Sequence, residues 1–284
     1  CAMEPDLVPY SALATLPAKA VLVLAPHPDD EVFGCGGAIA RHAGAGVAVC
    51  VVVLTDGARY GDAQVRQLES LAAAGLLGYG VPEFWNYPDR GLVCTDALVQ
   101  RLVEKIALSG TDLVYVPSPW EVHPDHRQTC QLGVEAVRRS ASDVRLVFYE
   151  VGMPLWPNVL LDITPLVEVK EAAMRCFGSQ LVQQDYVAHL QALNRYRSYT
   201  LGPDVLAAEA YWRVSPRELD QVLQGSVASL LASGTLNSRR LAMDAGAPVV
   251  PVGRRRSFYR RLKSWLARAL SWRSGRDQAP EDAG

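Results

Sequence analysis

The stretch that decides the fold is VLVLAPHPDDEVFGCGG, residues 21–37. It begins with an aliphatic and β-branched run at 21–24, which is typical of a parallel strand covered on both faces. Pro26 ends the run, because proline has no N–H to donate to a neighbouring strand. In open α/β sheets ligands bind beyond the carboxyl ends of the strands, so polar residues at this point lie where such a sheet does its chemistry. Four polar side chains follow within five positions: His27, Asp29, Asp30 and Glu31.

A strand followed by a helix recurs along the first half of the chain, with turn signals such as TDG at 55–57 between them. Strands alternating with helices predict an α/β fold with a doubly wound, mostly parallel sheet and helices on both faces. Beyond residue 150 the pattern is less regular. The predicted strands are 20–25, 47–54, 83–87, 112–117, 145–150, 159–163 and 210–214. The predicted helices are 31–43, 63–77, one that begins at Thr95 or Asp96, 126–138, 165–177 and 187–196.

The domain organisation follows from where this pattern stops. We expect one large domain over residues 1–214, a capping helix over 215–237, and a linker with a basic amphipathic tail over 238–284. Ser215 and Glu218 stand three positions apart before an apolar helical pattern, which is the spacing of a capping box. The chain is therefore predicted to be one α/β domain with a C-terminal helical extension.

The composition is that of a globular protein. Of the 284 residues 49% are apolar, and no apolar run reaches the roughly 18 residues of a membrane span. No secretory signal precedes the first strand, and the six scattered cysteines favour reduced thiols over a disulfide framework. A cytoplasmic location is therefore expected. The sequence begins at Cys1, for which removal of an initiator Met and a lipid-modified mature N-terminus are both open.

Residues 254–276 hold nine basic side chains and no acidic one, although the whole chain has a net charge of −2. Aromatic and aliphatic residues recur among them at helical spacing, the pattern of a basic amphipathic helix that lies on an anionic membrane surface. One hypothesis is peripheral association with the inner membrane surface through this segment. The other is docking of the helix on the acidic body of the same protein. No nucleic-acid partner is expected, since nothing else in the chain supports one.

Two short motifs stand at the ends of two predicted strands, HPDD at 27–30 and HPDH at 123–126. Together they hold three of the five histidines of the chain. The loops that follow parallel strands share one edge of the sheet, so the imidazoles and carboxylates are expected to meet there. A catalytic zinc site takes three protein ligands and leaves one position for water. The predicted ligands are His27, Asp30 and His126.

The other residues of the two motifs are predicted to move protons. Asp29, a carboxylate that does not bind the metal, can take a proton from activated water as general base. His123 can donate a proton to the developing oxyanion or to the leaving amine. We expect Asp125 to hold His123 and to raise its pKa.

Two other interpretations of these motifs are open. Either motif by itself is usually a turn with a helix cap, although two of them at one sheet edge favour a shared site. The glycines of GCGG at 34–37 suggest a nucleotide-binding turn, but the dinucleotide fingerprint requires a glycine where Ile39 stands. We expect these glycines to let the helix pack close to the sheet.

The two motifs resemble the signatures of the LmbE-like or PIG-L family of zinc-dependent N-deacetylases. APHPDDE at 25–31 with the two glycines at 36–37 closely matches the first signature, and HPDH at 123–126 matches the second. The resemblance covers about residues 20–214 and includes AEAY at 208–211. It implies a Rossmann-like fold, a zinc ion, and hydrolysis of the acetamide of a GlcNAc-type glycan, glycolipid or conjugate.

The resemblance also implies residue roles. It assigns zinc binding to His27, Asp30 and His126, the role of base to Asp29, and the role of electrophile or acid to His123. Arg66 and Asp89 resemble family residues that contact the sugar; as alternatives, Arg66 lies on a solvated helix face and Asp89 in a turn.

Two functions follow as hypotheses. The first is a zinc-dependent hydrolase that removes the N-acetyl group from an amino sugar by metal-activated water. The second is a catalytically inactive sugar- or nucleotide-binding module with a Rossmann-like fold. The complete set of motif side chains argues against the second, because a decayed site is expected to lack one or more of them.

Overall fold

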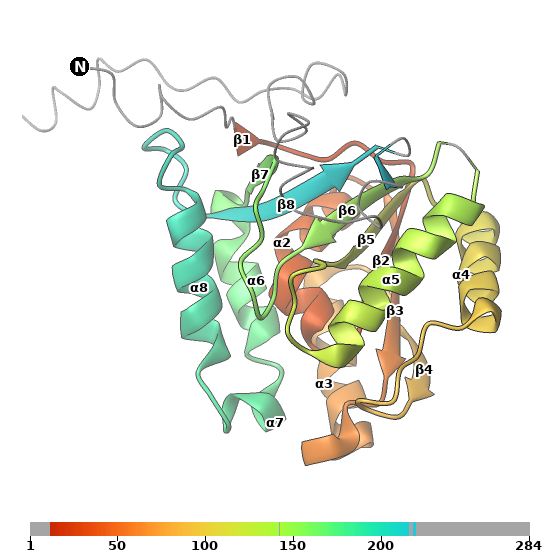
Figure 1. Cartoon of the computed structure of the whole chain (residues 1–284). Helices are drawn as coiled ribbons and strands as arrows, with labels where there is room; N and C mark the ends of the chain where they lie inside the picture. Colours follow the sequence, from red (N-terminus) through yellow and green to blue (C-terminus); the bar gives the residue numbers. More distant parts are fainter. Residues whose placement is uncertain (1–11, 142, 216–217, 220–284) are drawn as a thin grey trace, which may run out of the picture. The chain divides into compact units, whose positions relative to one another are not determined.

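The structure is a computed structural model that describes residues 12–141, 143–215 and 218–219. Within these residues an eight-stranded sheet has the order β1-β7-β8-β6-β5-β2-β3-β4 (Figure 1). All neighbouring strands are parallel except β8, which is antiparallel to both β6 and β7. The strands are β1 (Ala12–Leu13), β2 (Ala20–Ala25), β3 (Ala48–Thr55), β4 (Glu83–Tyr87), β5 (Leu113–Pro117), β6 (Arg145–Tyr149), β7 (Val159–Asp162) and β8 (Ala208–Val214).

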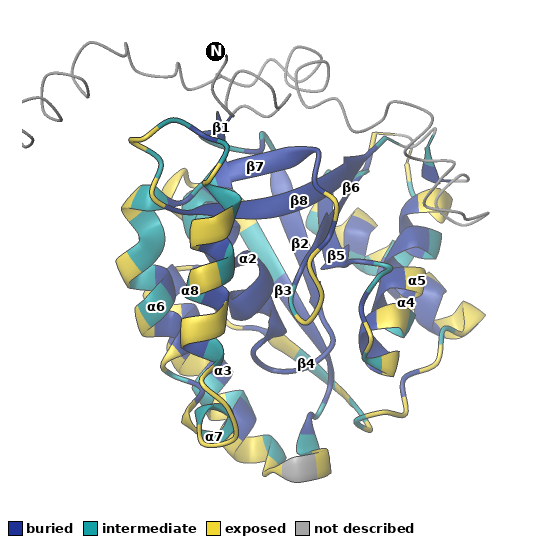
Figure 2. Cartoon of the chain, turned by 60° about the vertical axis from the view of Figure 1, so that its left-hand side comes forward, coloured by how far each residue is buried: buried dark blue, intermediate teal, exposed yellow. Residues whose placement is uncertain are grey.

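Helices cover both faces of the sheet because its central strands are apolar on both sides. All six residues of β2 are buried; Val21 and Val23 face one core layer, Leu22 and Leu24 the other. Figures 1 and 2 show α2, α3, α6 and α8 on one side, and α4 with α5 on the other. The doubly wound α/β prediction is confirmed. The helices are α2 (Asp30–Gly44), η1 (Ala58–Tyr60), α3 (Ala63–Leu77), α4 (Asp96–Ser109), α5 (Pro124–Arg139), η2 (Thr164–Leu166), α6 (Val167–Met174), α7 (Gly178–Leu181) and α8 (Tyr186–Arg197).

Some predicted elements differ from the structure for physical reasons. The helix predicted from residue 126 begins at Pro124, because proline suits the first turn and the His123 side chain caps the helix by accepting the N–H of Asp125. The helix predicted over 165–177 is divided into η2 and α6. β1, η1 and α7 were not predicted, because elements of two to four residues are too short to show a period in the sequence.

Helix α2 is broken at Cys35, whose φ and ψ of −141° and 25° are not helical. The break leaves the backbone N–H groups of Gly37 and Ala38 without partners inside the helix, and both donate to the carboxylate of Glu209, at 2.7 and 2.8 Å. Lys170 Nζ donates to the same carboxylate at 2.7 Å, and both charged side chains are buried. Glu209, which lies on β8, therefore caps the second half of α2.

The glycines of α2 are required by close packing. A Cβ on Gly34 would lie 2.3 Å from the ring of Tyr149, and one on Gly37 would lie 2.5 Å from Ile163. The prediction that these glycines let the helix approach the sheet is therefore confirmed. Close packing accounts for Gly34 and Gly37, so these glycines do not indicate a nucleotide-binding turn.

The regions beyond the main domain are largely outside the described residues. The tail at 254–276 and the linker lie there entirely, so both tail hypotheses stay predictions. The predicted capping helix is described at Ser215, Glu218 and Leu219 alone, where the Ser215 N–H donates to the Glu218 carboxylate at 2.8 Å, as a capping box requires. No helix among the described residues is both long and apolar enough to cross a bilayer. The five cysteines in this part of the chain are free.

Replacing Gly37 by alanine should destabilise the fold, because the new Cβ would also lie 2.9 Å from the Glu209 carboxylate. We expect a loss of about 1–3 kcal/mol in the free energy of unfolding, measured by urea denaturation. Gly75→Ala in α3 is the matched control: its Cβ meets nothing within 4 Å, so it should stabilise the protein by about 0.5–1 kcal/mol. Equal effects of both substitutions would contradict the packing argument.

Candidate active site

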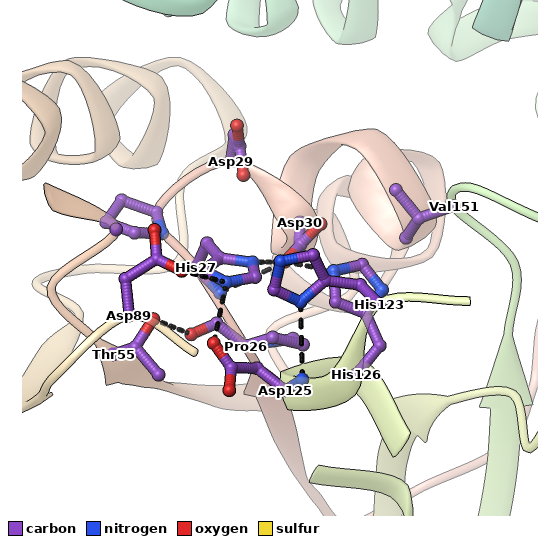
Figure 3. Close-up of polar contacts among 12 residues, drawn as sticks. Pro26, His27, Asp29, Asp30, Thr55, Asp89, His123, Asp125, His126 and Val151 are labelled. Carbon is purple, nitrogen blue, oxygen red and sulfur yellow. Dashed lines mark hydrogen bonds and ion pairs between the residues drawn. The ribbon is translucent and has the colours of Figure 1, made fainter. Parts of the chain in front are cut away.

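The carboxyl ends of β2 and β5, which are neighbours in the sheet, bring the two motifs together. Figure 3 shows the imidazoles of His27, His123 and His126 gathered with the carboxylates of Asp30 and Asp125. The ring centroid of His27 lies 4.6 Å from that of His123 and 5.3 Å from that of His126. The convergence expected from the sequence is therefore confirmed.

The carboxylate of Asp30 lies between two imidazoles. Its Oδ2 is 3.0 Å from Nδ1 of His27 and 3.2 Å from Nε2 of His126, and it accepts the backbone N–H of His27. All three side chains are buried. Burial by itself raises the pKa of Asp30, but the charges and hydrogen bonds of the two imidazoles hold it well below its usual range. Asp30 is therefore an ionised oxygen donor shared by both motifs.

Asp125 holds His27, which corrects the prediction that it holds His123. Its Oδ2 is 3.1 Å from Nε2 of His27 and accepts the backbone N–H of Arg90 at 2.7 Å. Each ring nitrogen of His27 therefore faces a carboxylate, Nε2 that of Asp125 and Nδ1 that of Asp30. With the proton of Nε2 held by Asp125, Nδ1 is the nitrogen that would bind a metal. This is how a carboxylate orients a metal-binding histidine and raises its basicity.

His123 has a different environment from the one predicted. Its Nδ1 accepts the backbone N–H of Asp125 at 3.2 Å, and the ring is half-buried. Burial and the nearby imidazoles of His27 and His126 lower the pKa of His123 and outweigh the Asp125 charge, which raises it as expected, so the predicted net rise is wrong. Because Nδ1 accepts a hydrogen bond, the neutral ring carries its proton on Nε2. The ring nitrogens of His27, His123 and His126 lie within 4.8 Å of one another, so His123 is a geometric alternative to Asp30 as third ligand.

The cluster offers donor atoms for a divalent cation. Among the described residues, single atoms of His27, His123 and His126 lie within 4.8 Å of one another, and so do atoms of His27, Asp89, His123 and Asp125. Nδ1 of His27 and Oδ2 of Asp30 share a hydrogen bond of 3.0 Å, whose proton a metal ion bound by both would displace. The predicted ligand set with Asp30 stays a prediction.

The pKa values show that the cluster has an excess of negative charge. Burial lowers the pKa of both histidines, yet the neighbouring carboxylates raise that of His27 well above its usual range and that of His126 to about 9. Two imidazole nitrogens and one carboxylate oxygen are a ligand set of catalytic zinc sites.

Asp29 is held in a strained position at the start of α2. Its φ of 139° is outside the regions that residues with a side chain normally occupy, at a cost of order 1–3 kcal/mol. Its backbone N–H donates to Glu31 at 3.0 Å, and its Oδ2 accepts from Arg66 at 2.9 Å. Burial raises the pKa of Asp29 to about 7, and the Arg66 guanidinium offsets only part of this rise. A carboxylate with this pKa suits a general base near neutral pH.

Arg66 is buried, so its solvated-face alternative is wrong. Besides Asp29 it donates to the carbonyl oxygens of Pro28, at 2.9 Å, and Gly57, at 2.7 Å. These contacts fix the loop that carries Asp29. Arg66 also lines the cavity described below, and its predicted contact with the sugar stays a prediction.

Asp89 belongs to the cluster and is more than a turn residue. Its Oδ1 is 3.7 Å from Nε2 of His27, and this neighbouring imidazole lowers the pKa of Asp89 to about 2. Its backbone N–H donates to Asp56 at 3.1 Å, which ties its loop to the turn after β3. The predicted role of Asp89 in holding sugar hydroxyls is not tested by these contacts.

Two buried carboxylates support the site. For Glu31 the sequence leaves open a helix first-turn anion, slightly favoured, and a partner of the site residues. It accepts from Ser70 at 2.6 Å and from the backbone N–H of Asp29, so it is a partner of the loop that carries Asp29.

Glu121 was not assigned to the site from the sequence. Glu121 accepts backbone N–H groups of residues 151–153 and lies 3.4 Å from Nδ1 of His126. Glu121 faces the ring of His126 as Asp125 faces that of His27, but only as an ion-pair contact, whereas Asp125 makes a hydrogen bond of 3.1 Å. Its position four residues after β5 was the only signal in the sequence.

A cavity of about 700 Å³ opens over the cluster. Its floor holds the imidazoles with Asp29, Asp30 and Asp89, and one wall comes from the α7–α8 region. Phe33 and Tyr186 also line it, with ring centroids 5.7 Å apart. This volume is in the range of roughly 300–1,000 Å³ that holds small-molecule ligands.

Comparisons with known proteins agree with this geometry. Residues 22–137 match the family model described as PIG-L: GlcNAc-PI de-N-acetylase. The chain is 31% identical over 190 residues to diacetylchitobiose deacetylase of Thermococcus kodakarensis, covering 57% of this chain and 70% of that protein. It is 28% identical over 236 residues to 4-oxalmesaconate hydratase of Pseudomonas putida, covering 71% and 91%. N,N'-diacetylchitobiose deacetylase from Pyrococcus horikoshii, solved with an inhibitor, aligns with a TM-score of 0.64 at 28% identity over 71% of this chain and 85% of that one.

Asp125→Asn should weaken metal binding, because an amide can accept the hydrogen bond of His27 Nε2 but lacks the negative charge that makes the ring a more basic ligand. We expect a loss of about 10- to 100-fold in affinity for Zn²⁺, measured by competition with a chromophoric chelator. Asp56→Asn is the control and should keep the affinity. Asp56 accepts backbone N–H groups of Ala58 and Asp89, which an amide oxygen can also do. Unchanged affinity in Asp125→Asn would contradict the assignment of Asp125 to His27.

Proposed function

The chain belongs to the PIG-L family, and on this premise we propose that it is a zinc-dependent hydrolase that removes the acetyl group from an N-acetylated amino sugar. The observation that carries the proposal is the placement of Asp30 between the imidazoles of His27 and His126, beside Asp29. The complete set of side chains around one cavity does not favour the inactive binding module.

His27, Asp30 and His126 would hold the ion, with Asp125 and Glu121 behind the two histidines. When bound, such an ion acts as a Lewis acid that polarises the substrate carbonyl and lowers the pKa of water from about 16 toward 7. Burial keeps the three donors in place before the substrate arrives, and Oδ2 of Asp30 contacts both imidazoles.

The remaining residues complete the hydrolysis. Asp29 takes a proton from water as the oxygen attacks the acetyl carbon, and Arg66 holds that carboxylate in place. The C–N bond then breaks as Asp29 passes that proton to the leaving nitrogen, while the Nε2–H of His123 donates a hydrogen bond to the carbonyl oxygen as negative charge develops on it. The products are the free amine and acetic acid, which ionises to acetate. General acid–base steps of this kind are typically worth about 10²–10⁴-fold each.

Removal of the metal by a chelator should abolish acetate release, and added Zn²⁺ should restore it. The substrates are N-acetylglucosamine and diacetylchitobiose, with acetate and new amine both quantified. A protein that holds zinc and releases no acetate from any N-acetyl sugar would contradict the proposal. Because one relative is named a hydratase, addition of water to 4-oxalmesaconate is measured in parallel; turnover there without acetate release would also contradict it.

Asp29→Asn should keep the metal and lower kcat by about 10²–10⁴-fold, since the amide accepts the Arg66 hydrogen bond but cannot take a proton. Metal content by elemental analysis and kcat by acetate release are measured on the same sample. Loss of the metal in this variant would mean that Asp29 is a ligand and that the roles of Asp29 and Asp30 are exchanged.

Membrane association of residues 254–276 and the lipid-linked character of the substrate are separate proposals. Co-sedimentation of the full chain with anionic vesicles, compared with a chain lacking those residues, tests the first.

A further inference from the structure

Exposed aromatic side chains are concentrated at one place on the protein. Of the large apolar side chains that are exposed in the described residues, three are aromatic: Trp156 at 58%, Tyr196 at 68% and Tyr199 at 65%. All three line the same surface hollow of about 210 Å³, together with Pro157. An exposed apolar cluster of this kind on a globular protein commonly marks a binding surface.

The hollow shares both of its walls with the active-site cavity. On the loop between β6 and β7, Pro154 lines the cavity and Trp156 lines the hollow. On α8, Leu193 lines the cavity, and Tyr196 lies one turn further along the helix in the hollow. Residues three and four positions apart lie on the same face of a helix, so the cavity and the hollow are next to each other on one face of α8. Leu193 and Tyr196 are separated by about one turn, or about 5 Å, along the helix axis.

The two walls are fastened to each other at this point. Arg197 donates from Nε to Glu150 at 3.0 Å and from Nη2 to the same carboxylate at 2.5 Å. It also donates to the backbone carbonyl of Leu155 at 2.8 Å. The loop and the end of α8 are therefore held in register, and the aromatic side chains they carry keep a fixed position relative to the cavity.

We propose that the hollow formed by Trp156, Tyr196 and Tyr199 is a distal sugar-binding subsite. It would hold a further pyranose ring of the same glycan whose acetamide lies over the metal site. The inference rests on the proposed function and extends it from a single amino sugar to a chain of rings.

The chemistry of the hollow suits a pyranose ring. One face of such a ring presents only C–H groups, which lose contact with water when they lie flat on an aromatic side chain. The hydroxyl groups at the ring edge remain free to bond, and Thr200 and Arg197 border the hollow as polar partners. An aromatic side chain is also stiff, so it loses little conformational freedom on binding.

The cavity itself is compatible with a neutral glycan. Gln180, Gln183 and Gln184 line it before the start of α8, whereas Tyr196 lies in the last turn of that helix. An amide side chain both donates and accepts hydrogen bonds without carrying charge, which matches hydroxyl groups. These amides would face the ring that carries the acetamide, and a further ring would extend past Leu193 toward Trp156.

The test compares acetate release from N-acetylated chitooligosaccharides of two and of four rings. Trp156→Ala should lower kcat/KM for the four-ring substrate by about 3- to 10-fold, mainly through KM, and leave the two-ring value unchanged. Tyr196→Ala should act in the same direction, and Trp156→Phe should retain most of the activity. Leu108→Ala, at an 88% exposed position on α4, is the control and should change neither value.

A binding measurement separates this inference from the proposed function. Calorimetry with the four-ring sugar on Asp29→Asn protein needs no turnover, and the affinity should fall about 3- to 10-fold when Trp156→Ala is added. If wild-type protein released no acetate but this fall in affinity appeared, the subsite would stand and the proposed function would fail. Equal effects on two-ring and four-ring substrates, or none on either, would overturn the subsite. So would loss of vesicle binding or of self-association in Trp156→Ala with unchanged glycan affinity.

Discussion

The site depends on one buried carboxylate that two distant segments share. Asp30 comes from the loop after β2 and His126 from the start of α5, and their side chains meet because β2 and β5 are adjacent strands. A buried anion is costly unless it is paired, so Asp30, His27 and His126 constrain one another. The constraint also explains why the pKa values of His27 and His126 rise although burial opposes a positive charge. The cluster is organised to receive a cation.

The site also depends on the geometry of α2. The helix must present Asp29 and Asp30 at its start while its later turns pack on the sheet, and it does so by breaking at Cys35. The N–H groups freed by the break are satisfied from β8, about 170 residues later in the chain, by Glu209. Lys170 neutralises that carboxylate in the core. A contact remote from the chemistry thus fixes the direction of the segment that carries it.

The alternation of strands and helices was enough to predict the fold class and the convergence of the two motifs, because strand order in parallel sheets brings carboxyl ends to one edge. The partner of each carboxylate could not be predicted. Asp125 is two positions from His123, which suggested that it holds that ring, but the turn directs its side chain to His27. The burial of Arg66 was likewise hidden, since Arg66 stands in an amphipathic helix and its partners Pro28 and Gly57 lie in other loops. Local spacing specifies residue types, whereas tertiary packing specifies which of them touch.

The arrangement separates reaction from recognition. The reacting groups come from the ends of β2 and β5, which are central strands held on both sides, and this gives them a rigid base. The walls come from α8 and from the loop between β6 and β7, at the less regular end of the sheet where β8 runs antiparallel. Substitutions in these walls leave the buried donor cluster intact, so the fold can change which glycan it accepts without rebuilding the metal site. Arg197 joins these two walls, because it lies on α8 and donates to Glu150 and Leu155 at the loop. A distal ring held by both walls would therefore stay at a constant distance from the scissile amide.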